Sequence, residues 1–154
     1  MLLGDILSAD GVKTIGATTS KKRLLHNLGE LAAAAYGLDA ATIAAALMVR
    51  EGLGPTGLGN GIALPHAHIE GIDTVLGMFI RLEKPMAFDS AHTQPVDLVF
   101  ALLAPENAGA EHLRALALVA RTMRDPATCA KLRANAEPVI LHAVLTEISA
   151  NQAA

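Results

Sequence analysis

The sequence predicts one α/β domain, with a central mixed β-sheet flanked by helices on both faces. Two observations carry this prediction: strand-like and helix-like segments alternate along the chain, and two apolar runs, residues 75–82 and 96–103, are typical of buried strands. At 154 residues, the chain is long enough to bury one hydrophobic core. We assign residues 3–148 to this domain and expect residues 149–154 to form a frayed tail.

The first half of the chain predicts two helices between two short strands. Thr19 or Ser20 caps the first helix, Gly37 ends it, and Asp39 caps the second, alanine-rich helix. In order, the predicted elements are a strand at 12–15, helices at about 20–37 and 39–51, a glycine-rich loop at 52–61 and a brief strand at 62–64 that stops at Pro65.

The second half predicts two strong strands followed by three helices. Beyond Asp97 the second strand is apolar on both faces, which places it in the centre of its sheet. Pro126 and Pro138 suit the first position of a helix and therefore open the last two helices. In order, the elements are a strand at 75–82, a polar connection at 88–94, a strand at 96–103, a loop at 105–109 and helices at 110–124, from 126 and from 138.

Composition and charge exclude several classes of function. The chain is 52% hydrophobic and 18% charged, which argues against disorder, and its net charge of −3 gives no electrostatic footprint for nucleic acid. No apolar segment reaches membrane-spanning length, and the N-terminus lacks the pattern of a signal peptide. A single cysteine, Cys129, fits a reducing compartment. We expect a cytoplasmic protein without membrane insertion.

The most informative stretch runs from Gly52 to His66. Five glycines crowd the span between Gly52 and Gly61, and glycine backbone can adopt positive φ and present its N–H groups to an anion. Pro65 restricts the backbone just before His66, so the imidazole direction is fixed beside that loop. The pattern indicates phosphate chemistry on an imidazole, although it matches neither a Walker loop nor a dinucleotide fingerprint. A tight helix-to-strand connection without a ligand is the alternative.

Three further residues are candidates for the same site. His68 makes a His-x-His pair with His66, but a zinc site needs a third ligand and only His112 is available, so we predict neither metal nor cofactor. His112 falls in the first turn of a helix, whose positive end favours a neutral ring; a packed histidine at the core's rim is the alternative. Arg50 would clamp phosphoryl oxygens, or else simply complement the carboxyl end of its own helix.

The remaining titratable candidates have no constellation around them in the sequence. We interpret His26, His92 and His142 as structural histidines. Cys129 has no activating histidine or aspartate pattern, so we do not interpret it as a nucleophile.

Taken together, these residues resemble the enzyme IIA domain of the fructose/mannitol class of the bacterial phosphoenolpyruvate-dependent phosphotransferase system, and within that class its nitrogen-regulatory branch. The resemblance covers about residues 3–148. The matching pieces are Arg50-Glu51, Thr56-Gly57-Leu58-Gly59-Asn60-Gly61-Ile62-Ala63-Leu64-Pro65-His66, Gln94-Pro95-Val96-Asp97-Leu98-Val99-Phe100, Leu103-Ala104-Pro105 and His112-Leu113.

The resemblance implies a role for each candidate residue. His66 would accept a phosphoryl group on Nε2, with its Nδ1–H held by a backbone carbonyl, while Arg50 and His112 line the active site. Gly59, Asn60 and Gly61 would contribute phosphate-binding groups from the loop. The implied donor is the phosphohistidine of a small HPr-type carrier.

Three functions remain open at this point. Our main hypothesis is a phosphocarrier whose phosphorylation state regulates a transporter or a sensor kinase. The alternatives are a fructose- or mannitol-type enzyme IIA that passes phosphate to a IIB domain, and a binding module without turnover. Two departures from the family concern partner contacts: His68 stands where many relatives carry Arg or Lys, and Ser90-Ala91-His92 replaces a more acidic turn.

Overall fold

The computed structural model describes residues 1–88 and 94–153, and the side chains of residues 1–88 and 94–147. The departure from the family pattern at Ser90-Ala91-His92 lies outside the described residues, as does the proposed structural role of His92.

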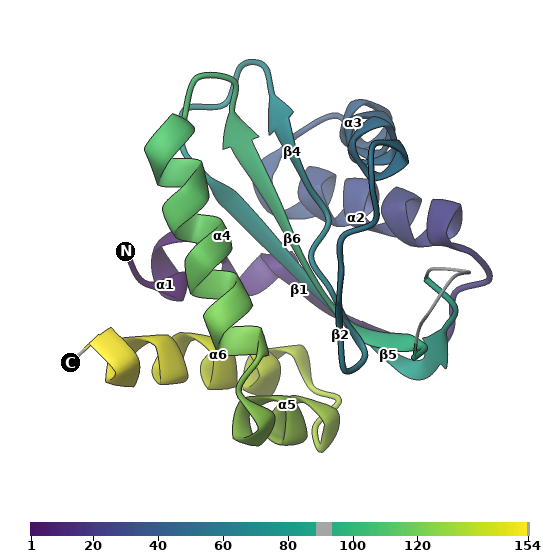
Figure 1. Ribbon diagram of the computed structural model, residues 1–154, viewed down its shortest axis with the longest axis vertical. Coiled ribbons are helices and arrows are strands. Elements are labelled where there is room, and N and C mark those ends of the chain that lie inside the picture. The colour runs from purple at the N-terminus through teal and green to yellow at the C-terminus, as the bar shows by residue number, and fades with distance from the viewer. Residues whose placement is uncertain (89–93, 154) are drawn as a thin grey trace.

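One mixed sheet forms the centre of the molecule (Figure 1). Its strands are β1 (Val12–Ile15), β2 (Gly57–Gly59), β3 (Ile62–Ala63), β4 (His66–Ile69), β5 (Leu76–Met86) and β6 (Val96–Pro105). β5 runs parallel to β1 and antiparallel to β6, while β3 and β4 both pair with β6 in parallel. The strand predicted to be central, β6, therefore lies between β5 on one side and β3 with β4 on the other.

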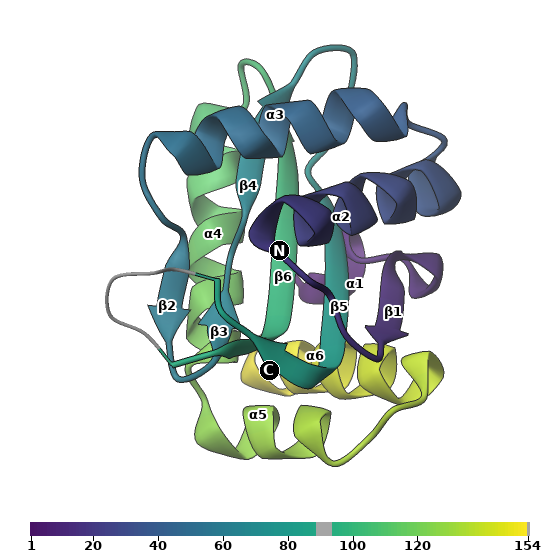
Figure 2. The same cartoon turned by 90° about the vertical axis from the view of Figure 1, so that its right-hand side faces the viewer.

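Helices cover both faces of the sheet (Figures 1 and 2), which confirms the predicted fold class. One face carries α2 (Lys21–Tyr36) and α3 (Ala40–Gly52). The other carries α1 (Leu3–Ile6), α4 (Gly109–Met123), α5 (Pro126–Arg133) and α6 (Pro138–Ala153), and a 3₁₀ turn, Ala9–Gly11, precedes β1.

The alternation of side chains along β6 divides the core into two clusters. Val99 and Leu103 pack with the residues under α2 and α3, whereas Phe100 and Leu102 pack with those under α4 and α6. Successive strand residues point to opposite faces, so a strand that is covered on both sides must be apolar at every position. This is the physical reason for the continuous apolar run in the sequence.

The predicted helix caps are present. The side chains of Ser20, Asp39 and Asp125 each accept a hydrogen bond from a backbone N–H three residues later, and Gly37 ends α2 in the left-handed conformation at φ 70°. The last helix differs from prediction, since α6 continues to Ala153 where a frayed tail was expected. No proline or glycine follows Pro138 to stop it.

A second difference from prediction concerns Pro65. The strand expected to stop there resumes immediately as β4, so His66 is the first residue of a strand. Pro65 has no N–H to donate, but its carbonyl accepts a hydrogen bond from the Leu102 N–H at 3.0 Å, which keeps the chain on the edge of β6. The proline therefore interrupts one long edge strand without ending it.

Candidate functional site

His66 is held at the sheet edge by its own backbone. Its Nδ1 lies 2.8 Å from the carbonyl oxygen of Leu64, two residues earlier. The ring is half-buried, and burial is the main cause that lowers its pKa below the ordinary histidine value. The Leu64 hydrogen bond and Glu51 oppose that shift, while Arg50 and His68 add to it. His66 is therefore predominantly neutral at pH 7.

His112 and His68 lie next to this imidazole. The His112 ring centroid is 5.6 Å from that of His66 and 4.7 Å from that of His68, although His112 comes from the first turn of α4. His112 is only 6% exposed, and its Nδ1 has no hydrogen-bond partner among the described residues. Burial, assisted by His68 and His66, lowers its pKa to about 4. The ring is neutral, as the sequence predicts, but burial is the main cause rather than the helix terminus.

Arg50 lies in the last turn of α3, and its Nη1 donates to the carbonyl oxygen of Gly54 at 3.0 Å. This contact holds the guanidinium at the edge of a pocket of about 480 Å³. Arg50, His66, His68 and His112 all line this pocket, and the rest of the lining is apolar. The structure thus brings together three of the predicted site residues and His68 in one surface depression.

Gly59, Asn60 and Gly61 lie elsewhere. Gly59 pairs with Ile62 across a two-residue turn, and both turn residues have positive φ, 56° at Asn60 and 81° at Gly61, as a type I′ hairpin turn requires. The turn residues are on the order of 15 Å from His66 along an extended edge. Gly59, Asn60 and Gly61 do not line the His66 pocket.

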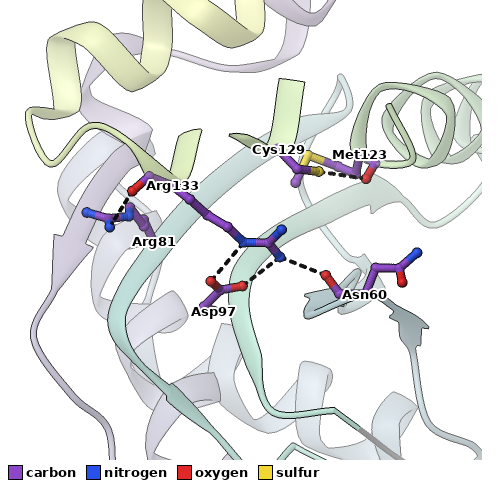
Figure 3. Close-up of polar contacts among 6 residues, drawn as sticks. All are labelled: Asn60, Arg81, Asp97, Met123, Cys129 and Arg133. Carbon is purple, nitrogen blue, oxygen red and sulfur yellow. Dashed lines mark hydrogen bonds and ion pairs between the residues drawn. The ribbon is translucent and has the colours of Figure 1, made fainter. Parts of the chain in front are cut away.

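The hairpin turn contacts α5 instead (Figure 3). Arg133, the last residue of α5, binds Asp97 through Nε and Nη2 at 2.9 Å each, and Nη2 also donates to the carbonyl oxygen of Asn60 at 2.7 Å. Arg81 donates to the Arg133 carbonyl at 2.8 Å. The second half of the glycine-rich segment is therefore a hairpin whose turn is anchored to α5, and the turn residues do not line the His66 pocket.

Sequence reasoning assigned no role to a buried carboxylate beside the pocket. Glu51 is 6% exposed, and it contacts Lys21 and both the N–H and the hydroxyl of Thr56. The Lys21 ammonium lies 2.9 Å from Glu51 and 4.3 Å from the centroid of the Phe88 ring. The sequence signal for Glu51 is its place in the matching pair Arg50-Glu51, which does not indicate that its carboxylate is buried.

The other candidates in the described part of the chain contact residues outside the pocket. His26 pairs with Glu30 at 3.0 Å, and His142 contacts the Leu7 carbonyl at 2.9 Å. Burial raises the pKa of the Cys129 thiol, which donates to the carbonyl of Met123. In the described part of the chain, no three histidine, cysteine or acidic residues are arranged to hold a metal ion. None of its described helices is long and apolar enough to cross a membrane.

Residues 5–147 match the family model described as "Phosphoenolpyruvate-dependent sugar phosphotransferase system, EIIA 2", so the chain belongs to this family. The family is a phosphotransferase component of that system.

Within this family, the chain is similar to nitrogen regulatory proteins. It is 41% identical over 154 residues to a nitrogen regulatory protein of Klebsiella oxytoca, covering 99% of this chain and 94% of that protein. The crystal structure of the nitrogen regulatory protein IIA-Ntr from Neisseria meningitidis superimposes with a TM-score of 0.84 at 36% identity, covering 94% of this chain and 99% of that one. These are the relatives that the sequence resemblance implied.

A more distant structure shows the fold alone. The enzyme IIA for mannitol of Escherichia coli, solved in complex with phosphorylated enzyme IIB, has a TM-score of 0.73 at 18% identity. That alignment covers 92% of this chain and 99% of the mannitol protein.

Proposed function

We propose that this chain is a cytoplasmic phosphocarrier that accepts a phosphoryl group on Nε2 of His66 from the phosphohistidine of an HPr-type protein. The observation that carries the proposal is the 2.8 Å contact between His66 Nδ1 and the Leu64 carbonyl. A carbonyl oxygen can only accept, so Nδ1 carries the ring proton and the free lone pair is on Nε2. The lowered pKa keeps that lone pair available at neutral pH.

The transfer step uses that lone pair directly. Nε2 attacks the phosphorus of the donor's phosphohistidine, an N–P bond forms on His66, and the electron pair of the breaking N–P bond returns to the donor's nitrogen. The His66 ring gains positive charge as the bond forms, since Nδ1 retains its proton. The Leu64 carbonyl stabilises that charge because a hydrogen bond from a charged donor is stronger than one from a neutral donor.

Arg50 and His112 supply charge neutralisation around the transferring group. Phosphoryl transfer depends mainly on in-line positioning and on stabilising the equatorial oxygens. The Arg50 guanidinium has five N–H donors and uses one for Gly54, which leaves donors for phosphoryl oxygens. With Nδ1 of His112 buried and unpartnered, the neutral ring is best accommodated with its proton on Nε2, as a second hydrogen-bond donor.

The proposed output is regulatory. The nitrogen regulatory proteins among the relatives align over nearly the whole chain, and we propose that the phosphorylation state of His66 controls target proteins such as transporters or sensor kinases. The description of the matched family supports a second candidate, transfer to a IIB domain for sugar uptake.

The test of the site is labelling with phosphoenolpyruvate, enzyme I and an HPr-type carrier. We expect acid-labile, base-stable label on the wild type and none on His66→Ala. His26→Ala is the matched control, since His26 is exposed on α2, where its Nε2 contacts Glu30. Undiminished labelling of His66→Ala would refute the assignment, and an unlabelled wild type would leave a binding module without turnover.

A second experiment separates the two outputs. Labelled protein is mixed with a fructose- or mannitol-type IIB domain, and the label on each partner is followed over time. Fast and complete transfer to the IIB domain would favour sugar uptake. Label that persists on this chain, together with target binding that differs between phosphorylated and free protein, would favour regulation.

A further inference from the structure

The carboxylate of Glu51 is buried at the end of α3, where three donors surround it. The Lys21 ammonium from the start of α2 lies 2.9 Å from Oε1. The backbone N–H of Thr56 donates to Oε1 at 2.9 Å, and the Thr56 hydroxyl donates to Oε2 at 2.6 Å. One carboxylate therefore fixes Thr56 through both its backbone and its side chain, and it fastens the turn after α3 to both helices.

Thr56 in turn connects to the acceptor imidazole. Its carbonyl oxygen accepts a hydrogen bond from the Leu64 N–H at 3.0 Å, which extends the pairing of β2 with β3 by one rung. The Leu64 carbonyl then accepts from His66 Nδ1. Glu51 is therefore linked to the His66 ring through the two residues Thr56 and Leu64, each by a direct hydrogen bond.

The same turn holds the guanidinium of the site. The Gly54 N–H donates to the Glu51 carbonyl at 3.2 Å, and the Gly54 carbonyl accepts from Arg50 Nη1 at 3.0 Å. Gly54 lies between Glu51 and Thr56, so a displacement of Thr56 also displaces the carbonyl that orients Arg50. Both groups proposed to handle the phosphoryl group therefore depend on the geometry of one turn, residues 51–56.

Stability alone gives no reason for an ionised residue in this position. Desolvation offsets much of the attraction in a buried ion pair, and well-packed apolar residues often stabilise a fold at least as well. What a fully bonded carboxylate does provide is a fixed direction for each donor. We propose that Glu51, with Lys21 and Thr56, is a positioning residue that sets the Leu64 carbonyl and so holds His66 with Nε2 unprotonated. This inference rests on His66 being the acceptor.

The test compares two threonines in equivalent bonds. Thr56→Val removes the hydroxyl that bonds Glu51, and Thr128→Val removes a hydroxyl that bonds the Asp125 carboxylate at the same 2.6 Å. Both threonines are buried, but the Thr128 hydroxyl donates to Asp125, the N-cap residue of α5, and not to a residue that is linked to His66. Thr56→Ser retains the hydroxyl and serves as the conservative variant.

Two quantities are measured for each variant: the single-turnover rate of phosphoryl acceptance, and the ¹⁵N chemical shifts of the His66 ring nitrogens, which report where the proton lies. For Thr56→Val we expect acceptance to slow by about tenfold or more, because small displacements of a reacting group have large effects on rate. We also expect a population with the proton on Nε2. Thr128→Val and Thr56→Ser should stay within about twofold of wild type and keep the proton on Nδ1.

Acceptance and ring shifts in Thr56→Val that match those of Thr128→Val would overturn the inference. If Thr56→Val does not fold, Glu51→Gln is measured in the same way with the same two expected changes, and unchanged values there would overturn it. An unlabelled wild type would refute the proposed function instead. The ring shifts would then decide the inference alone, since they require no transfer.

Discussion

The imidazole of His112, on α4, lies 5.6 Å from that of His66, on β4, with an angle of 50° between the ring planes. Both rings have pKa values below the ordinary value, chiefly because of burial. At neutral pH these two imidazoles are therefore uncharged, and the Arg50 guanidinium lines the same pocket. One ring can act as a nucleophile and the other as a hydrogen-bond donor, and neither carries a positive charge that would repel the Arg50 guanidinium.

His112 should make the fold less stable in acid. Its folded-state pKa is about 4, whereas an unfolded histidine titrates near 6.5, so the unfolded chain binds a proton that the folded chain does not. The free energy of unfolding should therefore fall as pH decreases from about 6.5 towards 4, by up to about 3 kcal/mol from this residue. His66 contributes in the same direction.

Urea denaturation of the wild type and of His112→Gln at several pH values checks this expectation. The variant should lose part of the slope between pH 6.5 and pH 4 and keep the smaller part due to His66. Parallel curves for the two proteins would mean that His112 does not titrate with a lowered pKa.

Arg50→Ala should fold normally and accept phosphate more slowly. Arg50 is half-buried at a helix end, where its loss affects few packed atoms. By analogy with other lost donors to developing negative charge, we expect acceptance to slow by about 10²-fold. Arg50→Lys keeps the positive charge but lacks the planar guanidinium, so its acceptance rate should lie between those of the wild type and Arg50→Ala. Single-turnover rates decide the matter, and a wild-type rate in Arg50→Ala would reduce Arg50 to a helix-end role.

The fold was predictable because its main determinants are local. Ser20 and Asp39 cap helices where the sequence places them, Pro126 opens α5 as predicted, and the apolar run of β6 is central. The break at Pro65 was predicted, but the resumption at His66 was not, since four residues beginning His-Ala-His carry little strand signal. Pairing with β6, a tertiary contact, decides that segment.

The site residues that could be predicted are those whose side chains have the functional groups that phosphoryl transfer needs. His66, Arg50 and His112 come together in the pocket. The glycines illustrate the opposite case, since Asn60-Gly61 followed by an apolar pair is a short-range hairpin signal that competes with the phosphate-loop interpretation. The Glu51 contacts with Lys21 and Thr56 were not predictable, because they depend on how α2 packs beside α3.

His68→Gln should raise the pKa of His66. His68 is exposed on β4, and its positive charge, when protonated, is one of the causes that lower the His66 pKa. Removing a like charge favours protonation of the neighbour. Titration by NMR should show the shift, and the acid limb of the acceptance rate should move to higher pH by the same amount. If the acid limb of the acceptance rate does not move in His68→Gln, then that limb reflects the titration of a group other than His66.

Asp97→Asn should destabilise the fold without slowing acceptance. Asp97 accepts two charge-assisted bonds from Arg133, whose side chain is 36% exposed, so we expect a loss of about 1–2 kcal/mol in the free energy of unfolding. Arg133→Lys is the matched partner variant, since Lys cannot form both bonds. Thermal or urea unfolding measures the loss, and an unchanged stability in both variants would show that the pair is no stronger than an exposed one.

The hairpin turn offers the clearest separation of fold from function. Gly61 has φ 81°, and a Cβ there would lie 2.7 Å from Arg133 Nη2 and 2.8 Å from Asp97 Oδ1. Gly57 has neither a positive φ nor an atom within 4 Å of its Cβ position. Gly61→Ala should therefore lower the free energy of unfolding by about 2 kcal/mol or more, and Gly57→Ala should change it far less.

Asn60→Gly keeps the positive φ and removes only the side chain, so we expect its acceptance rate to stay within about twofold of wild type. A much slower Asn60→Gly would mean that the turn contacts the phosphoryl group after all, and that the distance between the hairpin and His66 closes when the donor binds.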